Sequence, residues 1–190
     1  MTNATNFDVI IVGGGPAGLF GAYYLAEHSN LKILVIDRGK SPLKRSCPIK
    51  DNGCIHCNPC NILCGIGGAG LFSDGKLNFI HKLGKTDLTQ FLSEPDAKAL
   101  IDETEAIFNR FGMDGQVFPT DREQARRIRK EARRCGIDLL IIKQKHLGSE
   151  HLPTHINAMA DYVADRGVEF HHLEQALDIV VENGAVTGLI

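Results

Sequence analysis

The sequence lacks a long uninterrupted hydrophobic run. Its most apolar N-terminal stretch, FDVIIVGGGPAGLFGAYYLA, has no positively charged segment before it, contains Asp8 and is interrupted by Gly13, Gly14, Gly15 and Pro16. A signal peptide needs a basic start and an unbroken apolar core, and a membrane-spanning helix needs about 20 apolar residues. We therefore expect a cytoplasmic protein with no membrane segment.

An excess of one charge is also missing. Lys and Arg number 21 and Asp and Glu 23, for a formal net charge of -2, so nucleic acid is not an expected partner. The chain contains neither a Ser-His-Asp order nor an H-E-x-x-H motif, and hydrolase activity has no support. With 43% hydrophobic residues over 190 positions, the chain can bury a core of its own. The expected partner is a small-molecule substrate or electron acceptor.

A dinucleotide-binding pattern occupies the first 39 residues. The apolar run Phe7 to Val12 predicts a buried strand, GGGPAG follows it, a helix begins at Pro16, and a second strand runs from Lys32 to Ile36. Within G-x-G-x-x-G, the first glycine allows a tight turn, the second lets the backbone approach a pyrophosphate, and the third allows close helix packing. The three glycines are Gly13, Gly15 and Gly18.

An acidic residue completes this pattern. Asp37 stands at the end of the second predicted strand, where its carboxylate can accept hydrogen bonds from ribose hydroxyls, and the helix N-terminus offers free N–H groups to a diphosphate. Strand, turn, helix, strand and acid together predict a Rossmann-like α/β fold. The pattern leaves FAD and NAD(P) open as the nucleotide.

The remaining elements are predicted from local signals. Residues 39–84 read mostly as loop, and helices are expected from Ser93 to Gly112 and from Asp121 to Gly136. Strands are expected at 137–142 and 168–171, with a helix at 154–166 between them. A hairpin should turn at Asn183-Gly184. The predicted second strand of this hairpin runs to the last residue, so we expect an N-terminal fragment of a longer protein.

A cysteine-rich run precedes a glycine-rich one. Cys54, Cys57, Cys60 and Cys64 follow the C-x2-C-x2-C-x3-C spacing of ferredoxin cluster ligands, although the usual Pro after the last cysteine and a second cysteine run are both absent. An iron-sulfur cluster, a zinc ion with His56 or Cys47 as an alternative ligand, a redox disulfide and unliganded thiols all remain open.

The glycine-rich half, GIGGAGLFSDGK, leaves the backbone free to lie against a planar ring. The fingerprint together with CPIKDNGCIHCNPCNI, GGAGLFSDGKLN and HLGSEHLP resembles a family of bacterial FAD-dependent dehydrogenases. These are two-dinucleotide-binding-domain flavoproteins, distantly similar to the geranylgeranyl-reductase and glutathione-reductase types. Cys64 departs from the family pattern, whereas Cys47, Cys54, Cys57 and Cys60 follow it.

The resemblance implies a three-layer FAD/NAD(P)-binding fold that is incomplete at the C-terminus, and FAD as the cofactor. NAD(P)H is a possible reductant. The loop from Gly67 to Lys76 would then lie near the isoalloxazine or the pyrophosphate. The implied cofactor-binding residues are Gly13, Gly15, Pro16, Ala17, Gly18, Asp37, Arg38, Gly67, Gly68, Gly70, Ser73, Asp74 and Lys76.

We therefore expect the FAD-binding N-terminal part of a flavin-dependent oxidoreductase, a fragment that can be inactive alone, with no catalytic residue identified. An iron-sulfur or zinc electron-transfer module centred on the four cysteines, and an NAD(P)-binding fragment without activity, are the alternatives. The expected segments are a βαβ core with the Cys/Gly-rich loop at 1–85, a helical insertion with a connecting strand at 86–150, and the start of a further α/β segment at 151–190.

Histidines offer weaker signals. His146 and His151 flank a predicted turn and could serve as acid or base groups, but loop histidines are more often solvated. His171 and His172 are adjacent on a predicted strand and should point to opposite faces, which argues against a shared metal.

Overall fold

The computed structural model describes residues 6–49, 53–148 and 150–190. Contacts divide the chain into two compact units, one formed by Met1–Phe72 with Leu152–Ile190 and the other by Ser73–His151. The first unit is therefore discontinuous in sequence. Within the described ranges, no helix is both long and apolar enough to cross a bilayer.

The first unit is built on a parallel sheet. Strands β1 (Val9–Val12), β2 (Ile33–Asp37) and β8 (Glu169–His172) lie in the order β1-β2-β8, with Ile10 beside Leu34 and Val35 beside Phe170. Central strand β2 is the best buried, and its Val35 is 0% exposed. A central strand of a parallel sheet is covered on both faces, which explains its continuous apolar run.

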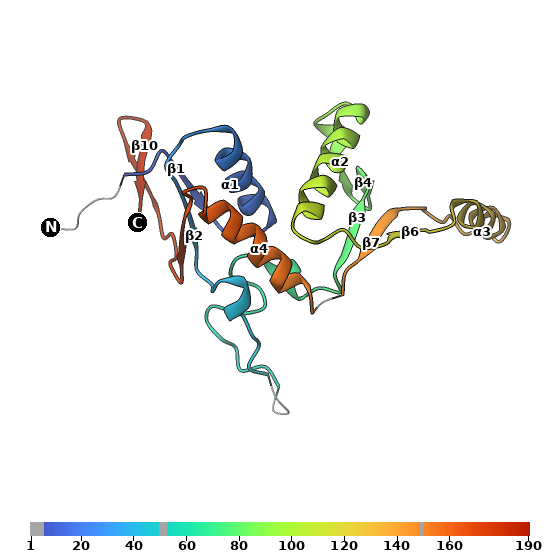
Figure 1. The fold of residues 1–190 in the computed structure, drawn as a ribbon, viewed down its shortest axis with the longest axis horizontal. Helices are drawn as coiled ribbons and strands as arrows, with labels where there is room; N and C mark the ends of the chain where they lie inside the picture. Colours follow the sequence, from blue (N-terminus) through green and yellow to red (C-terminus); the bar gives the residue numbers. More distant parts are fainter. Residues whose placement is uncertain (1–5, 50–52, 149) are drawn as a thin grey trace. The chain divides into compact units, whose positions relative to one another are not determined.

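Two helices cover one face of this sheet. Helices α1 (Pro16–His28) and α4 (Leu152–Ala164) lie side by side, coloured blue and orange in Figure 1, and the rings of Tyr23 and Tyr162 stack 5.9 Å apart between them. Ile11 of β1 points to this face, because it lies next to Gly18 and Gly21 of α1. The core here consists of side chains from α1, β2 and α4: Leu19, Ala22, Ile33, Val35, Met159 and Val163.

A hairpin lies over the opposite face. Strands β9 (Ile179–Glu182) and β10 (Ala185–Leu189) pair around Asn183 and Gly184, which have φ angles of 52° and 80°. These positive values fit the predicted type I′ turn. Residues 187–190 of the hairpin segment line a cavity together with Ile10, Leu34 and Ile36 of the sheet. Helices, sheet and hairpin form three layers, and the predicted Rossmann-like fold is confirmed.

Short 3-10 turns shape the segment between β2 and α4 in this unit. They are η1 (Pro42–Lys44) and η2 (Ala69–Phe72), and both contact α4. The stretch between them contains the cysteines and is irregular throughout its described part, as predicted for a functional loop.

The second unit has an antiparallel sheet and two helices. Strand β7 (Lys143–His146) pairs with both β3 (Lys76–Phe79) and β6 (Val117–Phe118), and β4 (Lys82–Leu83) pairs with β5 (Thr86–Asp87) before η3 (Leu88–Gln90). Helix α2 (Glu94–Arg110) is capped by Ser93, and α3 (Arg122–Arg134) by Asp121, as predicted. Each cap side chain accepts a hydrogen bond from a first-turn N–H group.

One sequence-based prediction is wrong in this unit. The strand expected at 137–142 lies instead at β7, because the apolar residues Ile137, Leu139 and Leu140 are exposed while the polar strand KQKH is paired on both sides. The error arises because the sequence of β7, KQKH, contains no apolar residue. The segment 39–84, predicted to be mostly loop, also contains the short strands β3 and β4 near its end.

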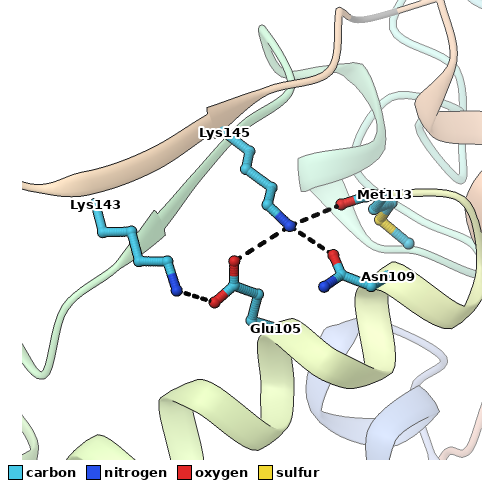
Figure 2. Close-up of polar contacts among 5 residues, drawn as sticks. All are labelled: Glu105, Asn109, Met113, Lys143 and Lys145. Carbon is cyan, nitrogen blue, oxygen red and sulfur yellow. Dashed lines mark hydrogen bonds and ion pairs between the residues drawn. The ribbon is translucent and has the colours of Figure 1, made fainter. Parts of the chain in front are cut away.

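Lysine burial in β7 depends on a charge network with α2. Figure 2 shows Glu105 of α2 between Lys143 and Lys145, and Lys145 is only 3% exposed. The Lys145 ammonium lies 3.2 Å from Glu105 Oε1, and it donates to Asn109 Oδ1 at 2.5 Å and to the Met113 carbonyl at 3.4 Å. Lys143 donates to the other Glu105 oxygen. A buried charge is tolerated when its donors are all satisfied, and this one has three acceptors.

Candidate dinucleotide-binding site

The turn between β1 and α1 has the geometry that the glycine spacing predicts. Gly13 has a φ of 97°, a left-handed conformation that favours glycine, and a side chain at Gly18 would place its Cβ 1.9 Å from the Gly13 carbonyl oxygen. Gly15 is the N-cap of α1 and provides no side-chain cap, and Pro16 stands in the first turn. The first turn of α1 contains no acidic residue, so its N–H groups are suited to an anion.

Asp37 ties the turn to the end of β2. Its Oδ2 accepts a hydrogen bond of 2.9 Å from the Gly14 N–H, and its Oδ1 accepts one of 2.7 Å from the Gly39 N–H. The adjacent Arg38 is exposed to solvent, and its Nε donates to Cys64 Sγ at 3.1 Å. The carboxylate is half-buried beside the glycine turn, where the sequence predicts the ribose-binding acid.

A cavity of about 390 Å³ opens beside this carboxylate. Part of a dinucleotide fits a space of this size, since ligand pockets usually measure about 300 to 1,000 Å³. Its walls come from the ends of β1 and β2, from the cysteine loop and from the segment after β8: Val12, Gly13, Ile36, Asp37, Arg38, Leu63, Cys64, Glu174, Gln175 and Ala176.

The glycine-rich loop lies directly against the fingerprint turn. The Gly67 N–H donates to the Gly14 carbonyl at 2.8 Å, and a Cβ at Gly68 would lie 3.3 Å from the Cα of Gly15. A Cβ at Gly14 would lie 2.1 Å from the end of the Ile66 side chain. The structure thus brings Gly67 next to Gly14 and Gly68 next to Gly15, while Gly70 is exposed in η2, and a role for these three glycines in cofactor binding stays a prediction.

Three of the proposed site residues belong to the second unit. Asp74 and Lys76 form an ion pair of 2.8 Å with each other, and the Ser73 hydroxyl accepts from the Gly75 N–H at 3.3 Å. The Lys76 contact is also the main cause of a lowered pKa for Asp74. These contacts are those of a polar turn, and a role for Ser73, Asp74 and Lys76 in cofactor binding stays a prediction.

Arg45 was not predicted from the sequence, yet it organises the loop. It is 5% exposed, and its guanidinium lies over the Phe72 ring at 5.1 Å. Burial lowers the pKa of Arg45, while the Asp37 carboxylate and the thiols of Cys64 and Cys60 act in the opposite direction. The guanidinium donates to five backbone carbonyls between residues 61 and 68, namely those of Asn61, Ile62, Gly65, Ile66 and Gly68.

The cysteines are not arranged as one ligand set. Cys54 is exposed, Cys57 and Cys60 are half-buried, and Cys64 is buried in the wall of the cavity. Among the residues that the structure describes, no three Cys, His, Asp or Glu side chains are grouped closely enough to hold a metal ion. The four-cysteine metal site thus stays a prediction that this geometry does not support.

Histidines lie outside the cavity lining. His146 at the end of β7 and His151 are exposed, and His151 lies 3.4 Å from Glu150. His172 stacks on Phe170, two residues earlier in β8, and His171 instead contacts Glu174 at 3.1 Å. The two neighbours on β8 therefore use opposite faces, as expected from strand alternation.

The sequence matches the Thi4 family over residues 1–43. A thiamine thiazole synthase of Sulfolobus acidocaldarius is 58% identical over 36 residues, which are 19% of this chain and 13% of that protein. An uncharacterised protein of Clostridium beijerinckii is 41% identical over 71 residues, which are 36% of this chain and 13% of that protein. The chain therefore aligns with only a small part of these curated relatives.

Solved structures match over nearly the whole chain. An L-amino acid deaminase from Proteus vulgaris, lacking its specific insertion sequence, gives a TM-score of 0.53 at 16% identity and covers 100% of this chain and 51% of its own. A glycine oxidase from Bacillus cereus gives a TM-score of 0.53 at 16% identity, and the match covers 97% of this chain and 52% of the oxidase. A 3-ketosteroid-delta4-(5alpha)-dehydrogenase from Rhodococcus jostii gives a TM-score of 0.55 at 12% identity, and the match covers 99% of this chain and 43% of the dehydrogenase. The chain thus shares the fold of these enzymes and spans about half of their length.

Proposed function

We propose that this chain is the FAD-binding part of a flavin-dependent oxidoreductase. The observation that carries the proposal is the contact between the two glycine motifs, where the Gly67 N–H donates to the Gly14 carbonyl. This contact joins a dinucleotide turn to the loop that resembles a flavoprotein ring-binding segment. The names of the structural relatives, an oxidase, a deaminase and a dehydrogenase, support the same reaction class.

The residues fit FAD in three ways. A Cβ placed at Gly13 would have no atom within 4 Å, so the turn leaves open space for a phosphate. The α1 N-terminus supplies unpaired N–H groups for the diphosphate, and Asp37 can bind ribose hydroxyls at the edge of the cavity. Bound FAD would supply the hydride or electron chemistry, and this chain's residues would hold and orient it.

A pair of alanine substitutions in one helix tests the site. Gly18→Ala would bring a Cβ to 1.9 Å from the Gly13 carbonyl and must distort the turn, whereas at Gly21 the nearest atom is an Ile11 methyl at 3.9 Å. Both changes raise helix propensity by a similar amount, about 1 kcal/mol. We expect Gly21→Ala to bind FAD as the wild type does, and Gly18→Ala to lose at least about tenfold in affinity.

The measurement is titration with FAD, followed by the flavin absorption bands and fluorescence, with NAD⁺ and NADP⁺ titrated in parallel. Saturable FAD binding by the wild type that is tighter than NAD⁺ binding supports the proposal. Failure of the wild type to bind FAD after reconstitution, or preferential binding of NAD⁺, would overturn it.

A further inference from the structure

A single buried side chain holds the loop that carries the second glycine motif. Arg45 Nη1 donates to the carbonyls of Ile66 at 2.9 Å, Gly68 at 2.8 Å and Gly65 at 3.3 Å. Its Nε donates to the Asn61 carbonyl at 3.0 Å, and its Nη2 donates to the Ile62 carbonyl at 2.6 Å. All three guanidinium nitrogens are thus engaged on residues 61–68, a described segment that contains no helix and no named strand.

The peptide between Ile66 and Gly67 transmits this contact to the fingerprint. A peptide unit is planar, and its C=O and N–H point in opposite directions. The Ile66 carbonyl accepts from Arg45, while the N–H of Gly67 in the same unit donates to the Gly14 carbonyl at 2.8 Å. Arg45 therefore fixes the direction in which this N–H meets the dinucleotide turn.

The preceding peptide is held in the same way. The Gly65 carbonyl accepts from Arg45, and the Ile66 N–H in that unit donates to the Lys40 carbonyl at 3.1 Å, next to the bridge between Lys40 and Gly65. Two successive peptide units are thus fixed between one cation and the segments that follow β1 and β2. Hydrogen bonds to a charged group in a buried site are stronger than neutral ones, which suits this role.

We propose that Arg45 is a positioning residue for the dinucleotide site, acting through the Ile66–Gly67 peptide to hold the glycine-rich loop against the Gly14 turn. The part of this role that concerns FAD rests on the proposed function above. The hold on the loop is a property of the unliganded chain. Lysine at this position would supply one charged centre in place of a planar fork with five donors, so it could not satisfy the same carbonyls.

The test compares Arg45→Lys and Arg45→Met with a core variant, Val163→Ala, which alters a buried side chain near the end of α4, whereas Ile156 in the first half of this helix lies beside Gly67. FAD affinity and thermal midpoint are measured for all of them. We expect Arg45→Lys to lose at least about tenfold in FAD affinity, and Arg45→Met more. Val163→Ala should lose thermal stability with less than about a threefold change in affinity.

Amide hydrogen exchange of the free proteins gives a readout that does not depend on FAD. In Arg45→Lys, the Gly67 amide should exchange at least about tenfold faster, while the amides of the β1-β2-β8 sheet keep their protection. The inference would be overturned if amide exchange accelerated uniformly over the whole unit or if Gly67 exchange stayed unchanged. It would also be overturned if Arg45→Lys lost no more FAD affinity than Val163→Ala at an equal thermal midpoint. If the wild type binds no FAD, the proposed function fails, and the exchange of Gly67 alone decides whether Arg45 positions the loop.

Discussion

The backbone N–H of Gly14 donates a hydrogen bond of 2.9 Å to Oδ2 of Asp37, so the acid at the end of β2 holds the glycine turn that follows β1. The same carboxylate accepts from the Gly39 N–H through its other oxygen at 2.7 Å. Asp37 therefore braces the turn at this strand end, and the sequence also predicts it as the ribose ligand.

Substitution of Asp37 should separate these roles. Asp37→Ala removes both acceptors and should destabilise the first unit by about 1 to 3 kcal/mol, because two backbone N–H groups lose a charged partner. Asp37→Asn keeps one acceptor oxygen and should fall between the wild type and Asp37→Ala in both stability and FAD affinity. Urea unfolding and FAD titration measure the two quantities. Equal behaviour of all three proteins would contradict the bracing role.

Gly39 should tolerate no side chain. A Cβ there would lie 2.3 Å from both the carbonyl carbon of Cys64 and the amide nitrogen of Gly65, and these backbone atoms cannot rotate away. We expect Gly39→Ala to cost about 1 to 3 kcal/mol of stability, as overpacking does in a close-packed interior. The control is Gly70→Ala, where nothing lies within 4 Å and the unfolding midpoint, followed by circular dichroism, should stay unchanged. If Gly39→Ala were as stable as the wild type, the backbone of Cys64 and Gly65 would not lie against Gly39 in solution.

Parts of both units, including the dinucleotide turn of the first, could be predicted from sequence because their signals are local. The turn needs its glycines at fixed positions, the caps at Ser93 and Asp121 act within one helical turn, and Asn183-Gly184 forms a tight turn by its own backbone preference. Each of these structures depends on residues only a few positions apart. None of them requires a partner that only the tertiary fold brings near.

The features that were missed depend on distant partners. Arg45 finds its carbonyl acceptors 16 to 23 residues further along an irregular loop, and nothing in the sequence around it distinguishes it from a surface arginine. The polar sequence of β7 predicts a loop. Lys145 is nevertheless buried in this strand because it pairs with Glu105, which lies on α2. Sequence periodicity reports apolar faces, and a buried ion pair leaves no such trace.

The Glu105–Lys145 pair should show strong coupling in stability. Glu105→Leu leaves the Lys145 ammonium buried with only Asn109 and the Met113 carbonyl as acceptors, and it should cost about 3 kcal/mol or more. The double variant Glu105→Leu with Lys145→Met removes both charges and should recover most of that loss, since apolar residues of similar size replace buried pairs at little cost. Urea unfolding of the single and double variants completes the cycle. Additive losses would show that the two charges do not interact.

Acid should weaken the same network. Burial favours the protonated form of Glu105, but hydrogen bonds and charge from Lys143 and Lys145 outweigh it and leave its pKa below the ordinary value of 4.5. A carboxylate with a lowered pKa in the folded state contributes stability that is present above the unfolded-state pKa and is lost as pH falls through the folded pKa. The stability difference between wild type and Glu105→Gln should therefore be constant above about pH 5.5 and shrink as the pH falls below about 4.5.

Asp87 provides the control for this pH dependence. Hydrogen bonds from Lys82 and Thr89 lower the pKa of Asp87 to about 2, so its ion pair with Lys82 should persist as the pH falls to about 4. The advantage of the wild type over Asp87→Asn should accordingly change little between about pH 6 and about pH 4, whereas its advantage over Glu105→Gln already shrinks below about pH 4.5. A wild-type advantage over Glu105→Gln that grows on acidification would contradict the assignment to Glu105.

The cysteines should react at rates graded by their burial. Cys54 and Cys135 are exposed and should be alkylated first, whereas Cys64 is 8% exposed and should react at least about tenfold more slowly. Cys64 also lines the cavity beside Asp37, so FAD bound there should slow its alkylation further and leave Cys54 unchanged. Peptide mass spectrometry after timed treatment with iodoacetamide measures each rate. Alkylation of Cys64 as fast as that of Cys54 would contradict the buried position in the cavity wall.

The same rates distinguish the structure from the four-cysteine metal site predicted by the spacing. Thiolates that ligate one ion are protected together and are released together when a chelator removes it. Cys54 would then react as slowly as Cys64 before chelation, and both would accelerate after it. The geometry described here predicts the opposite result, with Cys54 reactive from the start and a chelator without effect on either residue, because the exposed Cys54 and the buried Cys64 are not gathered in one ligand group.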